Sequence, residues 1–139
     1  MRKRGAVLAA GSLLLGLALV PLSASASAAG TLSCRATPTY PDVWNVGFDF
    51  QFVVTNTGTE AFNSWVITFD LPPGDVIYTT WNASVVQSGQ HVVAQSYGGY
   101  GSSVPPGGSV YGFGGVAQGP VVGGFTNVTC TPGVVLPIQ

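Results

Sequence analysis

Apolar and polar positions alternate most regularly between residues 44 and 58. Every second position there is a large apolar residue, namely Val46, Phe48, Phe50, Phe52 and Val54. A period of two residues is typical of a β-strand with one buried face. The run ends at Asn56-Thr57-Gly58, a sequence that favours a turn. We therefore predict that this strand forms a central wall of the core.

Other segments of the chain are also strand-like and are separated by turns. Residues 63–70 alternate again, and residues 35–43 predict an edge strand or an extended lead-in. Further strands are predicted at residues 76–81, 85–86, 91–95, 109–114 and 120–130. Residues 96–108 predict a loop, and residues 131–139 a short apolar tail. Without helical periodicity, this pattern predicts an antiparallel β-sandwich or barrel of about eight or nine strands.

The first 28 residues have the features of a secretory signal peptide. A basic start, Arg2-Lys3-Arg4, precedes an apolar run over residues 5–20 and a small-residue stretch from Ser23 to Ala29. The apolar run is short for a membrane span, which disfavours an N-terminal anchor. We therefore predict a signal peptide at 1–28, a single domain at 29–139, and a secreted, extracellular protein.

The charge of the predicted domain restricts the ligands that it could bind. After residue 28 the only basic residue is Arg35, and the acids are Asp42, Asp49, Glu60, Asp70 and Asp75. Nucleic acid and anionic membrane surfaces attract clustered basic residues, so both are disfavoured as partners. We expect the acids to be solvated turn and surface residues, and the ligand to be neutral.

The candidate chemistry does not point to an enzyme. Cys34 and Cys130 bracket the predicted domain, and in an exported protein such a pair predicts a disulfide. A metal-binding or catalytic thiol is disfavoured, because there is no second cysteine pair and the only histidine, His91, stands among Gln and Val. The sequence has no zinc-helix, nucleophile-elbow or phosphate-loop motif. We therefore expect no catalytic residue, no metal and no cofactor.

The aromatic residues remain as candidates for binding. Trp65 shares its parity with Ile67 and Phe69, so we predict that it is buried. Trp81 ends a strand, and the pattern does not decide whether it is buried or exposed. Tyr100 lies in a Gly/Ser loop and is predicted to be exposed. Trp44 is in register with the buried strand positions, so parity favours burial unless residues 45–47 are irregular.

Several of these residues belong to an ordered set of motifs. In chain order the set is Cys34, Trp44-Asn-x-Gly47-Phe48, Val54-x-Asn56-Thr57-Gly58, Trp65-x-Ile67-x-Phe69, Trp81-Asn82-Ala83, Pro106-Gly107-Gly108, Gly112-Phe113 and Cys130. The set resembles the family 2 carbohydrate-binding modules of secreted bacterial cellulases, and the resemblance covers residues 34–130. It implies an antiparallel β-sandwich or barrel, in agreement with the strand pattern.

The resemblance also implies a carbohydrate-binding site. Cellulose-binding members carry three exposed aromatic residues in a flat row, and Trp44 and Trp81 match two of these places. The third falls on Tyr100, where the family normally has Trp. Gln51 matches a polar position that hydrogen-bonds sugar, and Asn82 is a weaker polar candidate.

The expected function is non-catalytic binding of an insoluble polysaccharide, crystalline cellulose, by a monomer. Chitin and xylan stay open as ligands. A different class also stays open, namely a secreted surface or structural protein that associates with itself through its exposed rings.

Overall fold

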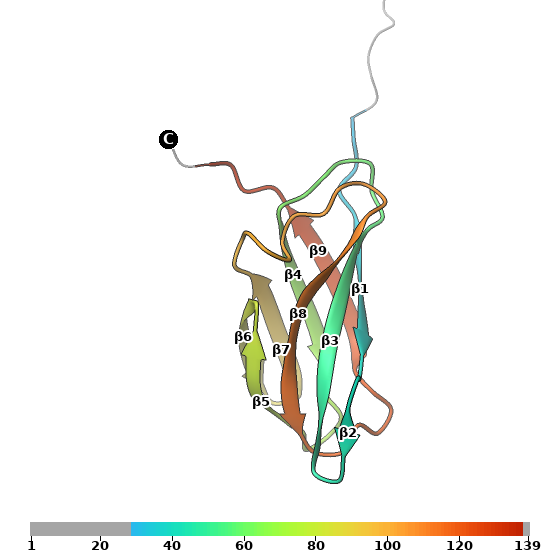
Figure 1. Ribbon diagram of the computed structural model, residues 1–139, viewed down its shortest axis with the longest axis vertical. Helices are drawn as coiled ribbons and strands as arrows, with labels where there is room; N and C mark the ends of the chain where they lie inside the picture. Colours follow the sequence, from blue (N-terminus) through green and yellow to red (C-terminus); the bar gives the residue numbers. More distant parts are fainter. Residues whose placement is uncertain (1–28, 138–139) are drawn as a thin grey trace, which may run out of the picture.

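The computed structural model describes residues 29–137, which form two antiparallel β-sheets packed face to face (Figure 1). The first sheet has the strand order β1 (Cys34–Thr39), β3 (Gly47–Asn56), β8 (Ser109–Gln118), β5 (Val76–Trp81), and the short β2 (Val43–Trp44) pairs with β3. The second sheet has the order β6 (Ala83–Ser88), β7 (His91–Ser96), β4 (Ser64–Asp70), β9 (Thr126–Gly133). The predicted all-β sandwich is therefore confirmed. The predicted signal peptide lies outside the described residues.

Strand β3 is the central wall that its alternation predicted. Phe48, Phe50, Phe52 and Val54 are fully buried. The Phe52 ring stacks on Phe113 from β8, with centroids 5.1 Å apart, so the two neighbouring strands build the core together. The predicted burial of Val46 in this strand is wrong, because Val46 is exposed in the turn that precedes the strand.

Several strand ends differ from the predicted ones. The predicted edge strand at 35–43 is two strands, β1 and β2, separated by residues 40–42. Strand β8 continues to Gln118, beyond the predicted end at residue 114. The prediction stopped too early because Gly114 and Gly115 carry no side chain that would continue the alternating pattern. Strand β9 begins only at Thr126 and runs to Gly133, so it includes part of the predicted tail.

The two sheets are linked to each other along both edges of the sandwich. The predicted disulfide between Cys34 and Cys130 is present and ties β1 to β9. At the other edge, the Gln87 side chain of β6 accepts a hydrogen bond from the Ile77 N–H and donates one to the Asp75 carbonyl of the segment leading into β5. The disulfide and the two hydrogen bonds of the Gln87 side chain therefore hold the two sheets together and stiffen the outer face of the first sheet. No helix among residues 29–137 is long and apolar enough to cross a membrane.

Candidate functional site

The outer face of the first sheet brings the predicted aromatic residues together. Across β3, β8 and β5, the residues Gln51, Gly114 and Trp81 lie opposite one another in register. In a second row, Trp44 of β2 lies opposite Gly47 of β3. We call the surface that carries Trp44, Trp81 and Gln51, together with Tyr100 in the loop at its end, the aromatic face.

A tight turn brings Trp44 to this face. Trp44 pairs with Gly47, and Asn45 and Val46 form the turn between β2 and β3. The chain reverses direction there, so parity counted along β3 does not carry over to β2. Trp44 is 43% exposed, and the burial that parity favoured is wrong.

Glycine lies beneath each of the two indoles. A Cβ at Gly47 would lie 3.1 Å from both Cζ2 and Nε1 of Trp44, and a Cβ at Gly114 would lie 3.0 Å from Cε2 of Trp81. The rings therefore lie down on the sheet where there is no side chain. Trp81 is 40% exposed, nearly the same as Trp44, as expected when one face of each ring rests on protein and the other meets solvent.

A hydrogen bond fixes the orientation of the Trp81 ring. Its Nε1–H donates to the Tyr111 hydroxyl at 2.6 Å. Tyr111 is on β8, opposite Val53, on the same outer face as Gln51. The indole of Trp81 is thus held between a glycine below it and a phenol hydroxyl at its edge. Sequence reasoning did not assign Tyr111 to the site, because no pattern shows which hydroxyl the indole reaches.

Tyr100 is carried by the loop between β7 and β8, which the core anchors. The buried Trp65 donates from Nε1 to the Gly101 carbonyl at 2.7 Å. A Cβ at Gly101 would lie 2.8 Å from the carbonyl oxygens of both Tyr111 and Gly112, so the loop backbone lies directly against β8. Tyr100 itself is 80% exposed, as predicted. The predicted burial of Trp65 is also confirmed.

The three aromatic residues are distributed along the strand direction. Four residues of β3 separate the level of Gly47, beneath Trp44, from that of Gln51, opposite Trp81, which is about 13 Å at 3.3 Å per residue. The anchor of Tyr100 beside Tyr111 lies at the level of Val53, about 7 Å further on. In Figure 1 β2 lies at the lower end of β3 and the 97–108 loop at the upper end. The aromatic face is therefore a strip about 20 Å long.

Polar side chains flank this strip. Gln51 points outward and is partly exposed, as predicted. Gln118 lies opposite Gly47, and the row between the indoles is Asp49, Val116 and Thr79. Asn82 has a φ of 67° and stands where the chain turns from β5 into β6, so it lies at the corner of the sandwich.

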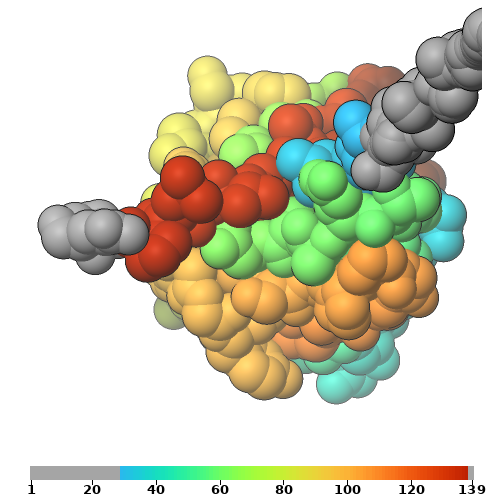
Figure 2. Space-filling model, turned by 90° about the horizontal axis from the view of Figure 1, so that it is seen from above, coloured from blue at the N-terminus to red at the C-terminus, as the bar shows by residue number. Residues whose placement is uncertain are grey.

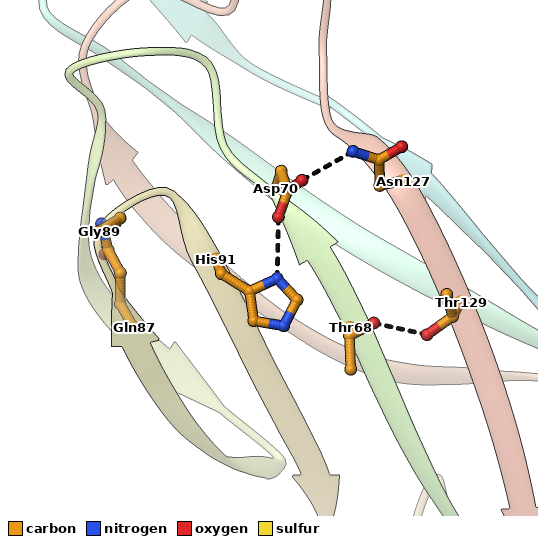
Figure 3. Close-up of polar contacts among 7 residues, drawn as sticks. All are labelled: Thr68, Asp70, Gln87, Gly89, His91, Asn127 and Thr129. Carbon is orange, nitrogen blue, oxygen red and sulfur yellow. Dashed lines mark hydrogen bonds and ion pairs between the residues drawn. The ribbon is translucent and has the colours of Figure 1, made fainter.

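The second sheet carries a separate polar cluster (Figure 3). Asp70 accepts a hydrogen bond from Asn127 Nδ2 at 2.7 Å, and its other oxygen lies 2.8 Å from His91 Nδ1. These two hydrogen bonds, that of Asn127 first, lower the pKa of Asp70. Residues 29–137 contain no group of three His, Cys, Asp or Glu side chains that could hold a metal ion. Asp70, His91 and Asn127 therefore form a hydrogen-bonded trio on the surface of the second sheet.

One acid departs from the prediction that all five are solvated. Asp75 is only 1% exposed, and both of its carboxylate oxygens are buried without a hydrogen-bond partner. Burial raises the pKa of this carboxyl. The turn sequence Leu71-Pro72-Pro73-Gly74 predicted solvent exposure. The prediction failed because the backbone of Gly119 lies directly over the carboxyl.

Comparison with known proteins agrees with the fold and identifies the family. The sequence profile of the cellulose-binding domain family matches residues 34–131. A cellulose/chitin binding protein of Mycobacterium tuberculosis is 36% identical over 119 residues, which cover 86% of this chain and 74% of that protein.

Two solved structures are similar as well. The chitin-binding domain of Chi18aC from Streptomyces coelicolor is 33% identical, with a TM-score of 0.58 over 73% of this chain and 92% of that domain. The cellulose-binding family 2 carbohydrate-binding domain from ScLPMO10C is 28% identical, with a TM-score of 0.54 over 73% of this chain and 98% of that domain. The chain therefore belongs to the cellulose-binding domain family, that is, to the family 2 carbohydrate-binding modules.

Proposed function

We propose that this protein is a secreted, non-catalytic domain that binds crystalline cellulose through its aromatic face. The observation that carries the proposal is the pair of half-exposed indoles, Trp44 and Trp81, each lying on a glycine of the same sheet face. Tyr100 extends the strip. The predicted signal peptide supports secretion, and the disulfide suits an oxidising compartment.

The binding energy comes from covering flat apolar surfaces. A cellulose crystal presents a level face of C–H groups, and an indole laid on it removes apolar area of both partners from water. If each ring buries roughly 100 Å² in total, it contributes about 2–3 kcal/mol at 25 cal/mol per Å². Three rings would contribute roughly 6–9 kcal/mol before the cost of association. The stiff sheet keeps that cost low, so micromolar binding is attainable without any charge.

Gln51 and Tyr100 contribute further to the affinity, through a polar contact and a third ring. Gln51 stands opposite Gly114, close to the Trp81 ring, and offers an amide to the hydroxyls of a glucan chain. Tyr100 keeps a flat ring where the family normally has Trp, but with less contact area. Asn82 is proposed as an additional polar contact at the rim.

Chitin is the second candidate ligand. The observation in its favour is the similarity to the Streptomyces coelicolor chitin-binding domain, at 33% identity. The chitin chain has the same ring geometry as cellulose and adds acetamido groups. A flat strip of rings accepts both, so the two ligands are distinguished by the polar side chains beside the strip.

The test is adsorption of the protein to microcrystalline cellulose and to chitin. We expect Trp44→Ala and Trp81→Ala each to weaken adsorption by at least tenfold, because each removes about 2–3 kcal/mol of contact. Tyr100→Ala should weaken it less. The melting temperature should stay near that of the wild type, since these rings lie outside the core.

Val86→Ala is the control, as Val86 is an exposed apolar residue on the outer face of the second sheet, away from the aromatic face. It should adsorb like the wild type. Unchanged adsorption of both Trp variants would contradict the proposal, and so would a concentration-dependent increase in light scattering that either Trp variant abolishes. Release of reducing sugar from cellulose would contradict the non-catalytic assignment.

A further inference from the structure

A concave surface lies on the second sheet, at the end that also carries the 97–108 loop. It is an open groove of about 630 Å³. Its floor is a row of three side chains in register across β7, β4 and β9, namely Gln95, Val66 and Thr131. One wall is the start of the loop, from Tyr97 to Gly99, and the other is the segment 133–137. Figure 2 looks down on this end, where the red segment near residue 135 lies beside the gold loop.

The wall formed by residues 133–137 is held in place by specific hydrogen bonds. Asn63 Nδ2 donates to the Val135 carbonyl at 2.9 Å, and the Val135 N–H donates to Asn63 Oδ1 at 2.7 Å. The Asn63 N–H also donates to the Gly133 carbonyl. The side-chain amide of Asn63 thus pairs with the backbone of the wall as a neighbouring strand would. This wall lies beyond the family match, which ends at residue 131, whereas the floor and the loop wall lie within it.

The chemistry of the groove suits a neutral, hydroxylated chain. Its lining includes no Asp, Glu, Lys, Arg or His. Gln95 supplies an amide, Thr131 and Ser103 supply hydroxyls, and Tyr97, which is 72% exposed, supplies a flat ring at the edge. A ring for the C–H face of a sugar, beside amides and hydroxyls for its edge, is the combination that recognises a pyranose. The volume lies within the range of about 300–1,000 Å³ that ligand sites occupy.

We propose that this groove is a second binding site, which binds a single chain of a neutral β-linked oligosaccharide. The choice of ligand class rests on the proposed function, but the site does not use the aromatic face. A groove encloses one chain, whereas the aromatic face meets a layer of chains. The loop serves both surfaces, with Tyr97 lining the groove and Tyr100 extending the aromatic strip.

The experiment is an NMR titration of the full domain with soluble cellohexaose and, separately, with the hexamer of N-acetylglucosamine. We expect saturable shifts at the amides of Val66, Gln95, Tyr97 and Thr131 with at least one of the two sugars. Tyr97→Ala should weaken this binding at least tenfold. The same variant is tested for adsorption to insoluble cellulose, where it should match the wild type. Val86→Ala, on the second sheet but outside the groove lining, is the control that should leave both measurements unchanged.

The outcomes separate the two sites. Saturable groove shifts in a protein that fails to adsorb to cellulose or chitin would support the groove and contradict the proposed function. The absence of saturable groove shifts with both sugars would overturn the groove, whatever the adsorption result. It would also be overturned if Tyr97→Ala bound the soluble sugars as well as the wild type.

Discussion

At the scale of single residues, Tyr111 fixes the orientation of the Trp81 ring. Its hydroxyl accepts the hydrogen bond from Trp81 Nε1, and its oxygen lies over Gly114, where a Cβ would collide with it. An indole that was free to rotate about χ1 and χ2 would lose conformational entropy on binding a flat surface, and this loss would weaken binding. The hydrogen bond to Tyr111 therefore preorganises the ring for the contact with cellulose that we propose.

Tyr111→Phe tests this role, because it removes the hydroxyl and keeps the ring. We expect affinity for cellulose to fall about two- to tenfold, the equivalent of one net hydrogen bond of about 0.5–1.5 kcal/mol. The melting temperature should change little, since the bond lies on the surface. Adsorption isotherms and thermal unfolding measure both. Tyr78→Phe is the matched control, and an isotherm of Tyr111→Phe that overlays the wild type would show that packing alone fixes Trp81.

Asp75 is a second residue whose role is visible only in the folded protein. Its two carboxylate oxygens are buried and unpartnered, and burial raises its pKa. The folded state therefore favours the protonated acid. Below the unfolded-state pKa the carboxyl is protonated in both states, so its ionisation does not affect stability. As the pH rises from the unfolded-state pKa to the folded-state pKa, the carboxyl ionises in the unfolded chain first and the folded state loses stability.

Asp75→Asn should accordingly raise the melting temperature at neutral pH, because a neutral amide replaces a buried charge. The difference between variant and wild type should shrink as the pH falls towards the usual range of an Asp pKa. Comparing the two proteins cancels the opposite trend of Asp70, whose pKa is lowered and which loses its stabilising contacts in acid. Thermal unfolding between pH 3 and 8 measures this. A variant less stable than the wild type at neutral pH would mean that the carboxylate has a partner in solution.

At the scale of elements, the sequence predicted strands well where side chains carry the pattern. The alternation of β3 predicted its buried face from Phe48 to Val54, and β5 was placed at its observed ends. The predictions failed where the chain changes direction or lacks side chains. The turn at Asn45-Val46 reversed the parity of Trp44.

Glycine explains why the site was harder to predict than the fold. Gly114 ended the predicted strand, yet in the structure it is the floor on which Trp81 lies. The family resemblance identified Trp44, Trp81 and Tyr100, but nothing in the sequence indicated that Tyr111 would hold Trp81 or that Asn63 would fix a groove wall. Such contacts join residues 30 and 72 positions apart in the chain, and they form only because β5 pairs with β8 in one sheet and β4 pairs with β9 in the other.

At the scale of the whole molecule, the two proposed binding surfaces lie on opposite sheets of one stiff sandwich. The disulfide closes one corner across 96 residues of chain, and Gln87 closes the other. Binding on one sheet should therefore leave the other sheet undistorted. The 97–108 loop is the one element that contributes to both surfaces, through Tyr97 and Tyr100.

Charge gives the last prediction, because it concerns the domain as a whole. Beyond residue 28 the chain has one basic residue, Arg35, and five acids, of which only Asp49 lies between the two indoles on the aromatic face. Attraction to a neutral glucan cannot depend on these charges, whereas apolar contact is slightly strengthened by salt. We therefore expect adsorption to cellulose to change less than about twofold between low salt and about 1 M NaCl. Asp49→Asn is the control for charge on the face and should give the same salt response. A steep loss of adsorption with salt, reduced in Asp49→Asn, would mean that ionic contacts hold the protein on its ligand and that the aromatic strip does not account for binding.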